Sequence, residues 1–408
     1  MENANSLLTL SKNSSDLISK KPGVLFVLGT LWGENGITSH LLTLSQELIK
    51  QGWRVGLVSK LASDVDGALE EATRSAKEFE SCGVDFFPIS SSNSYLFKKY
   101  QILLDLKRAI SKFSPDIIHS HSLSVCPYLT LIKLFARIPC VSTCHVEPTL
   151  SNRAVKLGSQ ISSFTSPIWG DRLIAISTEL KVAFQKTLMV PEKKIRLVHH
   201  GINHHHFRPP SLEERTNARN SYNLSSDDKV VCLIGRLAPS KGHDLLIKAL
   251  GILKTKGVKA NALLAGKAYG KEEVNLKALA IEQGVENQIR FLGKTDTRQV
   301  LWASDVSVLP SRSGSEGFAL VIPESMLCGV LPIRTPAAGS KDQIEDGVNG
   351  FIIPFEDAEA LAIKLENVLL NNDLKSKIAT AALIKAQQSF TVERMVENTI
   401  NVYQELVK

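Results

Sequence analysis

Short apolar runs alternate with amphipathic stretches along most of this 408-residue chain, and no other feature restricts its fold so strongly. Each run is about as long as a strand, and each stretch between runs leaves room for a helix. Strands read as continuous apolar runs when crossover helices bury both faces of a parallel sheet. In the first half, such runs occupy residues 24–28, 54–59, 84–89, 116–121, 140–145, 172–177 and 195–200. The first half is therefore predicted to be an α/β domain.

A polar segment with two prolines, 207–228, interrupts the pattern, and a second series of apolar runs follows it. That series occupies residues 230–235, 261–266, 289–293, 306–310, 330–335 and 351–355, and three helical segments end the chain. A single hydrophobic core stops growing at about 250 to 300 residues, so two domains are expected. We predict two Rossmann-like domains that face each other across a cleft. The predicted parts are a polar tail at 1–22, domains at 23–208 and 209–390, and a helix at 391–408 that packs back toward the first domain.

The composition favours a cytosolic protein. No apolar run approaches the roughly 20 residues that span a bilayer, and the first residues lack the basic-then-apolar order of a signal peptide. The six cysteines lie scattered in apolar surroundings, which favours reduced, buried thiols over a disulfide framework.

The net charge of +7 is unevenly distributed, because residues 1–208 hold 24 basic and 17 acidic side chains and residues 209–408 hold 24 of each. Such an excess attracts anionic lipids, nucleic acid or an anionic substrate, or it serves solubility alone. We expect no nucleic-acid partner.

Two cations follow the first strand of the second half. Arg236 and Lys241 lie between that strand and a helix predicted to begin near His243. The N-terminus of a helix favours an anion, and arginine and lysine both bind phosphate. The pair therefore indicates a pyrophosphate site, although two solvated loop charges would give the same pattern.

Two carboxylates follow a later strand in the segment SRSGSEGFALVIPESMLCG. Glu316 is predicted to begin a helix, and Glu324, eight positions on, would then lie near the same face. Sugar and ribose hydroxyls are suitable partners for carboxylates on such an apolar helix. The alternatives are a capping role for Glu316 and a buried ion pair for Glu324.

The order Gly-Arg-Leu…Lys-Gly, followed about eighty residues later by Glu-Gly-Phe-x5-Glu, closely resembles glycosyltransferase family 4. This resemblance implies a GT-B fold and transfer of a sugar, with retained configuration, from a nucleoside diphosphate sugar. It also implies that Arg236 and Lys241 hold the donor pyrophosphate in place of a metal ion, that Glu316 binds the sugar and that Glu324 binds the ribose. The donor-binding residues expected in this way are Gly36, Arg236, Lys241, Gly317, Phe318, Ala319, Leu320 and Glu324, and the catalytic residues are His145 and Glu316. No cofactor and no metal are expected.

The chain departs from the family pattern at three positions. Ile37 stands where a second glycine is usual, so only Gly36 is carried over from that loop. His200 stands where asparagine is usual, and Asp342 occupies the place of a glutamate, which could alter acceptor or sugar contacts. The histidine-rich run 199–207 invites a metal interpretation, which we reject because consecutive side chains diverge and no carboxylate or thiolate is spaced to complete a shell.

Residues 95–113 read as a basic amphipathic helix, which either lies on an anionic membrane or simply covers the sheet. The expected protein is thus a cytoplasmic transferase, which is either freely diffusing or peripheral at the inner face of the membrane. Its donor is a UDP-sugar rather than a GDP-sugar, and its acceptor is a glycan or a lipid-linked molecule in polysaccharide or glycolipid synthesis. The alternatives are a GT-B epimerase or phosphorylase, and a non-catalytic nucleotide-binding partner.

Overall fold

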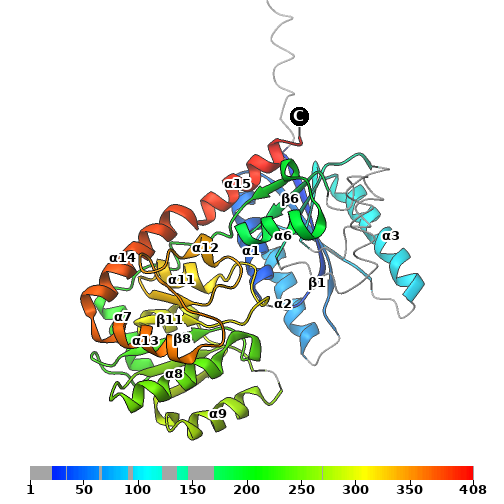
Figure 1. The fold of residues 1–408 in the computed structure, drawn as a ribbon. Helices are drawn as coiled ribbons and strands as arrows, with labels where there is room; N and C mark the ends of the chain where they lie inside the picture. Colours follow the sequence, from blue (N-terminus) through cyan, green and yellow to red (C-terminus); the bar gives the residue numbers. More distant parts are fainter. Residues whose placement is uncertain are drawn as a thin grey trace, which may run out of the picture.

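The computed structural model describes residues 21–33, 35–63, 67–90, 95–121, 136–145, 170–268 and 270–407, with the backbone alone for 95–100 and 188. These residues form two α/β domains, each built on one parallel sheet with helices packed on it (Figure 1). The predicted fold class is confirmed. Each predicted strand coincides with an observed one, apart from small differences at the ends.

The N-terminal sheet, within the described residues, has the strand order β3-β2-β1-β4-β5-β6-β7. Its strands are β1 (Gly23–Leu31), β2 (Arg54–Leu61), β3 (Asp85–Pro88), β4 (Ile117–Ser120), β5 (Cys140–Cys144), β6 (Arg172–Ala175) and β7 (Ile195–Leu197). Its helices are α1 (Gly36–Lys50), α2 (Ala68–Ser81), α3 (Tyr95–Phe113) and α6 (Thr178–Leu188). Strand β1 is buried over most of its length, as expected for a central strand covered by helices.

The C-terminal sheet has the order β10-β9-β8-β11-β12-β13 in the same part of the chain. Its strands are β8 (Val230–Ile234), β9 (Asn261–Ala265), β10 (Ile289–Gly293), β11 (Val306–Leu309), β12 (Leu331–Arg334) and β13 (Phe351–Ile352). Its helices are α7 (Leu212–Ser221), α8 (His243–Thr255), α9 (Glu272–Glu282), α10 (Thr297–Ala303), α11 (Val321–Leu327), α12 (Ser340–Gln343), α13 (Ala358–Leu370) and α14 (Asn372–Ser389). Short 3-10 helices lie at Glu192–Lys194, Pro239–Lys241 and Glu286–Gln288.

The strand order reverses once in each sheet, between β1 and β4 and between β8 and β11. Ligands of open parallel sheets bind beyond the carboxyl ends of the strands at such a reversal, because the loops there diverge and leave a crevice. The two crevices therefore predict where each domain contributes to a site.

The last helix, α15 (Val392–Gln404), follows α14 and returns to the N-terminal domain (Figure 1). It packs on α1, and its apolar side chains join the core around β1. The hydroxyl of Tyr403 lies 2.7 Å from His119 Nδ1, and Glu405 pairs with Arg172 and Arg196 at 2.6 and 2.7 Å. The end of the chain is thus part of the first domain's core.

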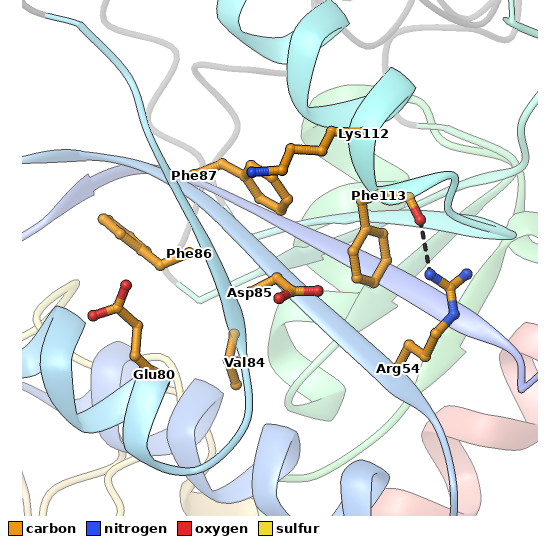
Figure 2. A pocket seen from close by; sticks show the side chains of 8 residues that line it. All are labelled: Arg54, Glu80, Val84, Asp85, Phe86, Phe87, Lys112 and Phe113. Carbon is orange, nitrogen blue, oxygen red and sulfur yellow. Dashed lines mark hydrogen bonds between the residues drawn. The ribbon is translucent and has the colours of Figure 1, made fainter.

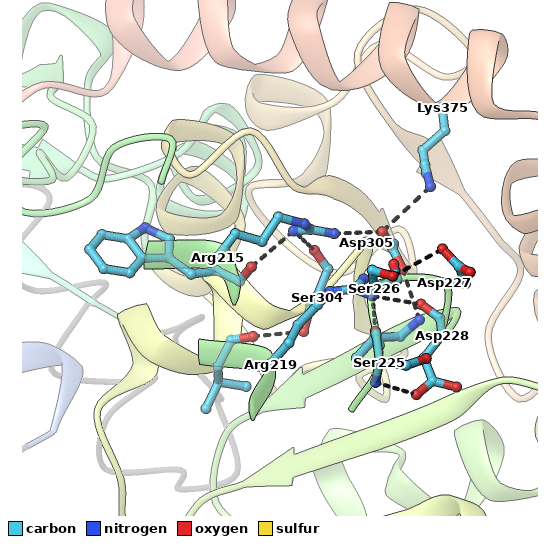
Figure 3. A network of polar contacts seen from close by, with 12 residues as sticks. Arg215, Arg219, Ser225, Ser226, Asp227, Asp228, Ser304, Asp305 and Lys375 are labelled. Carbon is cyan, nitrogen blue, oxygen red and sulfur yellow. Dashed lines mark hydrogen bonds and ion pairs between the residues drawn. The ribbon is translucent and has the colours of Figure 1, made fainter. Parts of the chain in front are cut away.

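A buried carboxylate, Asp305, ties several elements together at the amino end of β11 (Figure 3). It accepts hydrogen bonds from Arg215 at 2.8 Å, Arg219 at 3.1 Å and the backbone N–H of Val230 at 2.8 Å, and Lys375 lies 3.4 Å away. The side chain of Asp305 is only 9% exposed. The network therefore fixes α7 and α14 on the sheet.

Asp305→Ala is expected to lower the free energy of unfolding by about 3–5 kcal/mol, because it leaves the buried Arg219 and the half-buried Arg215 and Lys375 without their common partner. Urea denaturation followed by circular dichroism measures the change. Asp227→Ala is the matched control, since this exposed carboxylate accepts one bond from Ser226 and should change stability by less than about 0.5 kcal/mol. Equal losses in the two variants would contradict the assigned role.

The described residues bear on two expectations, that the cysteines are reduced and buried and that no segment spans a membrane. No disulfide bond joins the cysteines of the described ranges, and Cys140, Cys144, Cys232 and Cys328 are buried whereas Cys82 is half-buried. Cys126 lies outside those ranges.

No helix in the described part of the chain combines the length and the apolar character needed to cross a bilayer.

Candidate functional site

Lys241 and Glu316 form an ion pair where β8 and β11 end. Lys241 Nζ donates to Glu316 Oε1 at 2.6 Å, and the hydroxyl of Ser311 donates to the same oxygen at 2.6 Å. Glu316 is 8% exposed, so its charge is held by these two donors and little by water. Lys241 and Glu316, which the sequence singled out, are thus in contact. They meet at the reversal of strand order between β8 and β11, where a site is expected.

The prediction that a helix begins at Glu316 is wrong. Helix α11 begins at Val321, and Glu316 lies in the loop before it, so the two-turn spacing to Glu324 does not apply. Gly314, with φ 73°, holds this loop in a left-handed turn. Pro323 lies in the first turn of α11, where a missing N–H is tolerated.

The backbone segments beyond β8, β9 and β11 approach one another so closely that the contacts require glycine. A Cβ on Gly266, where φ is 152°, would lie 1.9 Å from the carbonyl oxygen of Gly235. A Cβ on Gly242, where φ is 72°, would lie 2.2 Å from the carbonyl oxygen of Pro310. Arg236 is exposed beside this packed backbone and has no ion-pair partner among the described residues. Its guanidinium is therefore available to an anion.

The loop that carries Glu316 also contacts the other domain. A Cβ on Gly317 would lie 2.1 Å from the carbonyl oxygen of His145, which follows β5. Phe318 is buried and stacks on His199, with ring centroids 5.5 Å apart. Across the same cleft, the position of a Cβ on Gly36 is 3.7 Å from Leu320. The segment 316–320 of the C-terminal domain thus joins the two domains. Its contacts in the N-terminal domain include His145 and Gly36.

Glu324 lies on α11 and keeps only partial contact with solvent. Burial raises the pKa of Glu324 to about 7, and no described cation pairs with it. An unpaired carboxylate in such surroundings is costly unless hydroxyl or N–H donors reach it. The group is therefore poised to accept hydrogen bonds from a ligand.

Five buried histidines gather where β4, β5 and β7 end and α1 begins. They are His40, His119, His121, His145 and His200. Burial lowers the pKa of His145 well below its usual value, and lowers those of His40 and His119 to about 4 and about 3. The imidazole of His145 is therefore neutral near pH 7, and no acidic side chain of the described residues pairs with it.

His119, at the end of β4, is fully bonded inside the domain. Its Nδ1 contacts the hydroxyl of Tyr403, and its Nε2 lies 2.8 Å from the hydroxyl of Thr143. Both ring nitrogens are therefore used to anchor α15 on the sheet. His119 is a structural residue.

Asp342, one of the departures from the family pattern, binds the other domain. Its carboxylate accepts hydrogen bonds from the backbone N–H and the hydroxyl of Thr178, at 2.7 and 2.6 Å, at the start of α6. Glu179 accepts in return from the backbone N–H groups of Gly339 and Lys341, at 3.1 and 3.3 Å. Asp342 therefore helps to dock the two domains, and the expectation that it alters sugar or acceptor contacts stays a prediction.

Two residues that position the site were missed in the sequence. Ser311 was not distinguished from other loop serines, although its hydroxyl orients Glu316. Arg334 is fully buried, and its guanidinium donates to the side chain of Gln343 and to the carbonyl oxygens of Ala337 and Ala338. Burial lowers the pKa of Arg334 to about 10, which still leaves it charged. The signal in the sequence was a basic residue, Arg334, at the end of an otherwise apolar strand.

A pocket of about 400 Å³ lies elsewhere, at the edge of the N-terminal sheet (Figure 2). It is lined by Arg54, Glu80, Val84, Asp85, Phe86, Phe87, Lys112 and Phe113. Arg54 begins β2 and Asp85 begins β3, so the pocket lies at the amino ends of these strands. The residues described above lie at the carboxyl ends, which makes this pocket separate from the candidate site.

Two sequence profiles match the chain in succession. The profile of "Glycosyltransferase Family 4" matches residues 34–206, and that of "Glycosyl transferases group 1" matches residues 214–385. One match falls on each domain, so both halves are accounted for. The chain belongs to glycosyltransferase family 4. It is therefore a transferase of the hexosyltransferase type.

Relatives within this family share about a quarter of their residues with the chain. A D-inositol 3-phosphate glycosyltransferase of Saccharomonospora viridis is 27% identical over 307 residues, which cover 71% of this chain and 70% of the relative. An N-acetyl-alpha-D-glucosaminyl L-malate synthase of Bacillus anthracis is 25% identical over 334 residues, covering 78% and 83%.

Solved structures of similar fold cover nearly the whole of this family 4 chain. A glycosyltransferase of Rickettsia africae has a TM-score of 0.83 at 21% identity and covers 95% of this chain and 99% of its own. Anabaena HepE, solved in complex with UDP and glucose, has a TM-score of 0.77 at 22% identity and covers 94% and 100%. These likenesses confirm the GT-B fold.

Proposed function

We propose that this family 4 enzyme transfers a sugar from a nucleoside diphosphate sugar, preferably a UDP-sugar, to a hydroxyl group of a glycan or lipid-linked acceptor. The anomeric configuration is retained, and no metal ion takes part in the transfer. The observation that carries the proposal is the ion pair of Lys241 with Glu316, bonded also by Ser311, beside the exposed Arg236. The complex of HepE with UDP and glucose supports the choice of UDP.

Lys241 and Arg236 neutralise the diphosphate as the glycosidic bond breaks. A fixed cation that meets charge as it develops stabilises the transition state more than the ground state. Glu316, held by Lys241 and Ser311, accepts hydrogen bonds from hydroxyls of the transferred sugar. Backbone groups of the segment 317–320 lie against the sugar and the phosphates.

His145 and Glu324 complete the donor site from opposite sides. The neutral imidazole of His145 faces the sugar from the N-terminal domain, in contact with the loop of Glu316 through its own backbone. Glu324 accepts hydrogen bonds from the ribose hydroxyls, which relieves the cost of its burial. Closure of the two domains on the donor excludes water and limits hydrolysis.

The acceptor side lies in the N-terminal domain, which carries the excess of basic residues. A surface of this sign favours an anionic acceptor, such as a lipid-linked phosphate. The names of the two relatives also contain anionic molecules, an inositol phosphate and malate. We place the reaction in polysaccharide or glycolipid synthesis at the cytoplasmic side of the membrane.

A panel assay tests this proposal. The purified chain is incubated with single UDP- and GDP-sugars, with and without phospholipid vesicles, inositol 3-phosphate, malate or oligosaccharides, and the released nucleotide is measured. We expect release from a UDP-sugar that increases when one acceptor is added. Conversion of the donor sugar without an acceptor would instead indicate an epimerase, and no turnover of any donor would indicate a non-catalytic protein.

The affinity for UDP is expected to fall about tenfold between pH 8 and pH 6 because of Glu324. A carboxyl group with a pKa of about 7 is ionised at pH 8, and it must lose a proton at pH 6 before it can accept two ribose hydrogen bonds. Calorimetric titration of UDP at both pH values measures the change. Glu324→Gln is the control, because protonation of UDP itself affects both proteins equally; identical pH slopes would contradict the ribose assignment.

Association with an anionic membrane is also proposed, through the cations of α3, of which Lys107 and Arg108 are exposed. From Gln101 onward the apolar face of this helix is packed on its own sheet, so electrostatic attraction, and not insertion, would bind it. Neutralising Lys98, Lys99, Lys107 and Arg108 is expected to reduce sedimentation with phosphatidylserine vesicles at least about fivefold. Replacing the exposed Lys248, Lys254 and Lys256 of the C-terminal domain is the charge control, and equal losses would exclude α3.

A further inference from the structure

Three histidines at the inner end of the interdomain cleft have the spacing of metal ligands. His40 on α1, His121 after β4 and His145 after β5 each bring one ring nitrogen within 4.8 Å of the other two. His121 Nδ1 lies 3.1 Å from His145 Nε2. In a tetrahedral zinc site, nitrogen ligands lie about 2.0–2.1 Å from the ion, which places them about 3.3–3.4 Å from one another. The closest pair is therefore already near the separation of two ligands.

The same three side chains carry buried nitrogens that no described group satisfies. Each has a ring nitrogen without a hydrogen-bond partner, namely Nδ1 of His40, Nε2 of His121 and Nδ1 of His145. Native structures satisfy nearly all buried polar atoms, so an interior group of several unsatisfied ones requires an explanation. The close pair consists of Nδ1 of His121 and Nε2 of His145, so an ion bound there leaves Nε2 of His121 and Nδ1 of His145 as N–H groups. Of the three unsatisfied nitrogens, Nδ1 of His40 is the one that the same ion can engage.

We propose that His40, His121 and His145 form a binding site for a transition-metal ion of the zinc class. Neutral imidazole suits zinc, copper and nickel, whereas calcium and magnesium require oxygen ligands, which these residues lack. Three histidines with one open position are a ligand set that zinc accepts without a carboxylate. His40 and His145 are 7% and 8% exposed, so the cluster is buried but not fully closed off from solvent. The site goes beyond the proposed transfer, in which Arg236 and Lys241 neutralise the diphosphate without a metal.

His200 supports the three ligands from behind. Its ring stacks on that of His40 with centroids 4.1 Å apart, and both of its nitrogens are buried without a partner in the described structure. A ring held in this way fixes the orientation of His40, as neighbours of metal ligands commonly do. The histidine that replaces the usual asparagine at this position thereby acquires a role.

A second group, His204, His205 and Glu393, must be separated from the first by experiment. The expectation that no carboxylate is spaced to complete a shell around the histidine-rich run is wrong, because α15 places Glu393 Oε2 3.4 Å from His204 Nδ1. His205 and Glu393 are exposed, however, and water satisfies them without an ion. The buried cluster is the stronger site because its nitrogens have no such alternative.

The test uses the full chain, freed of metal with EDTA, and zinc chloride or cobalt chloride as the only added ligand. We expect one zinc ion per chain by equilibrium dialysis with elemental analysis. Cobalt should give the visible absorption typical of tetrahedral nitrogen ligands. His40→Gln and His121→Gln should each weaken zinc binding at least about tenfold, while the paired change His204→Gln and His205→Gln should leave it unchanged.

Circular dichroism and thermal unfolding show whether each variant folds. If His40→Gln or His121→Gln does not fold, the wild-type cobalt spectrum and the zinc-induced rise in Tm decide the question. Absence of saturable zinc binding, a weak octahedral cobalt spectrum, or loss of binding only in the His204 and His205 variant would each overturn the proposal.

Discussion

Lys241→Ala is expected to lower kcat about 100- to 1,000-fold, the loss typical of removing one fixed group that stabilises transition-state charge. The lysine Nζ lies 2.6 Å from Glu316 Oε1, so its removal affects both partners. The leaving diphosphate loses a cation, and Glu316 keeps only the hydroxyl of Ser311. Steady-state kinetics with the best donor of the panel measures the loss.

Lys248→Ala is the matched control, because it removes the same charge from the exposed face of α8. It should change kcat less than about twofold. A Glu316→Gln variant and the double variant extend the test, since residues in contact give non-additive losses. Full activity in a correctly folded Lys241→Ala variant would exclude the pair from the donor site.

Gly317→Ala is expected to reduce kcat/KM about 100-fold, because misplacement of catalytic groups by about 1 Å has an effect of this size. The added Cβ would lie 2.1 Å from the carbonyl oxygen of His145 and 3.0 Å from its carbonyl carbon. Both neighbours are backbone atoms, so the two domains must separate to make room. Glu316 and His145 then no longer face one donor.

Gly36→Ala is the control on the opposite wall of the cleft. Its methyl group would lie 3.7 Å from Leu320, an ordinary contact, so a loss under about fivefold is expected. Small-angle scattering would report any opening in the Gly317→Ala variant. Equal activity in Gly317→Ala and wild type would contradict the close docking of the domains.

Much of the fold could be predicted because it depends on local patterns. Buried parallel strands are continuous apolar runs, so β1 and β8 were evident from their sequences alone. The helix at α3 was predicted with its observed ends, since its amphipathic pattern is regular. Helix α11 was extended too far toward Glu316, because the glycine conformation and the interdomain contact that hold the loop open are tertiary effects.

The candidate site could be predicted only in part, since motif residues are visible in a sequence and their surroundings are not. Arg236 and Lys241 stood out as charges at a helix start. The docking role of Asp342 depends on a contact between segments more than a hundred residues apart. The partners that hold Glu316 are Lys241, 75 residues away, and the single hydroxyl of Ser311. The histidine cluster was missed for the same reason, because His40 and His145 meet only when the sheet assembles.

The central claim is that the donor binds to Arg236, Lys241, Glu316 and Glu324. Calorimetric titration of UDP tests this claim most directly. Wild-type protein is compared with Arg236→Gln, Glu324→Gln at pH 8, and Arg290→Gln as a control at the far edge of the C-terminal sheet. The account predicts UDP binding by the wild type, at least about tenfold weaker binding by each site variant, and no change in the control. Unchanged affinity in both site variants would contradict it.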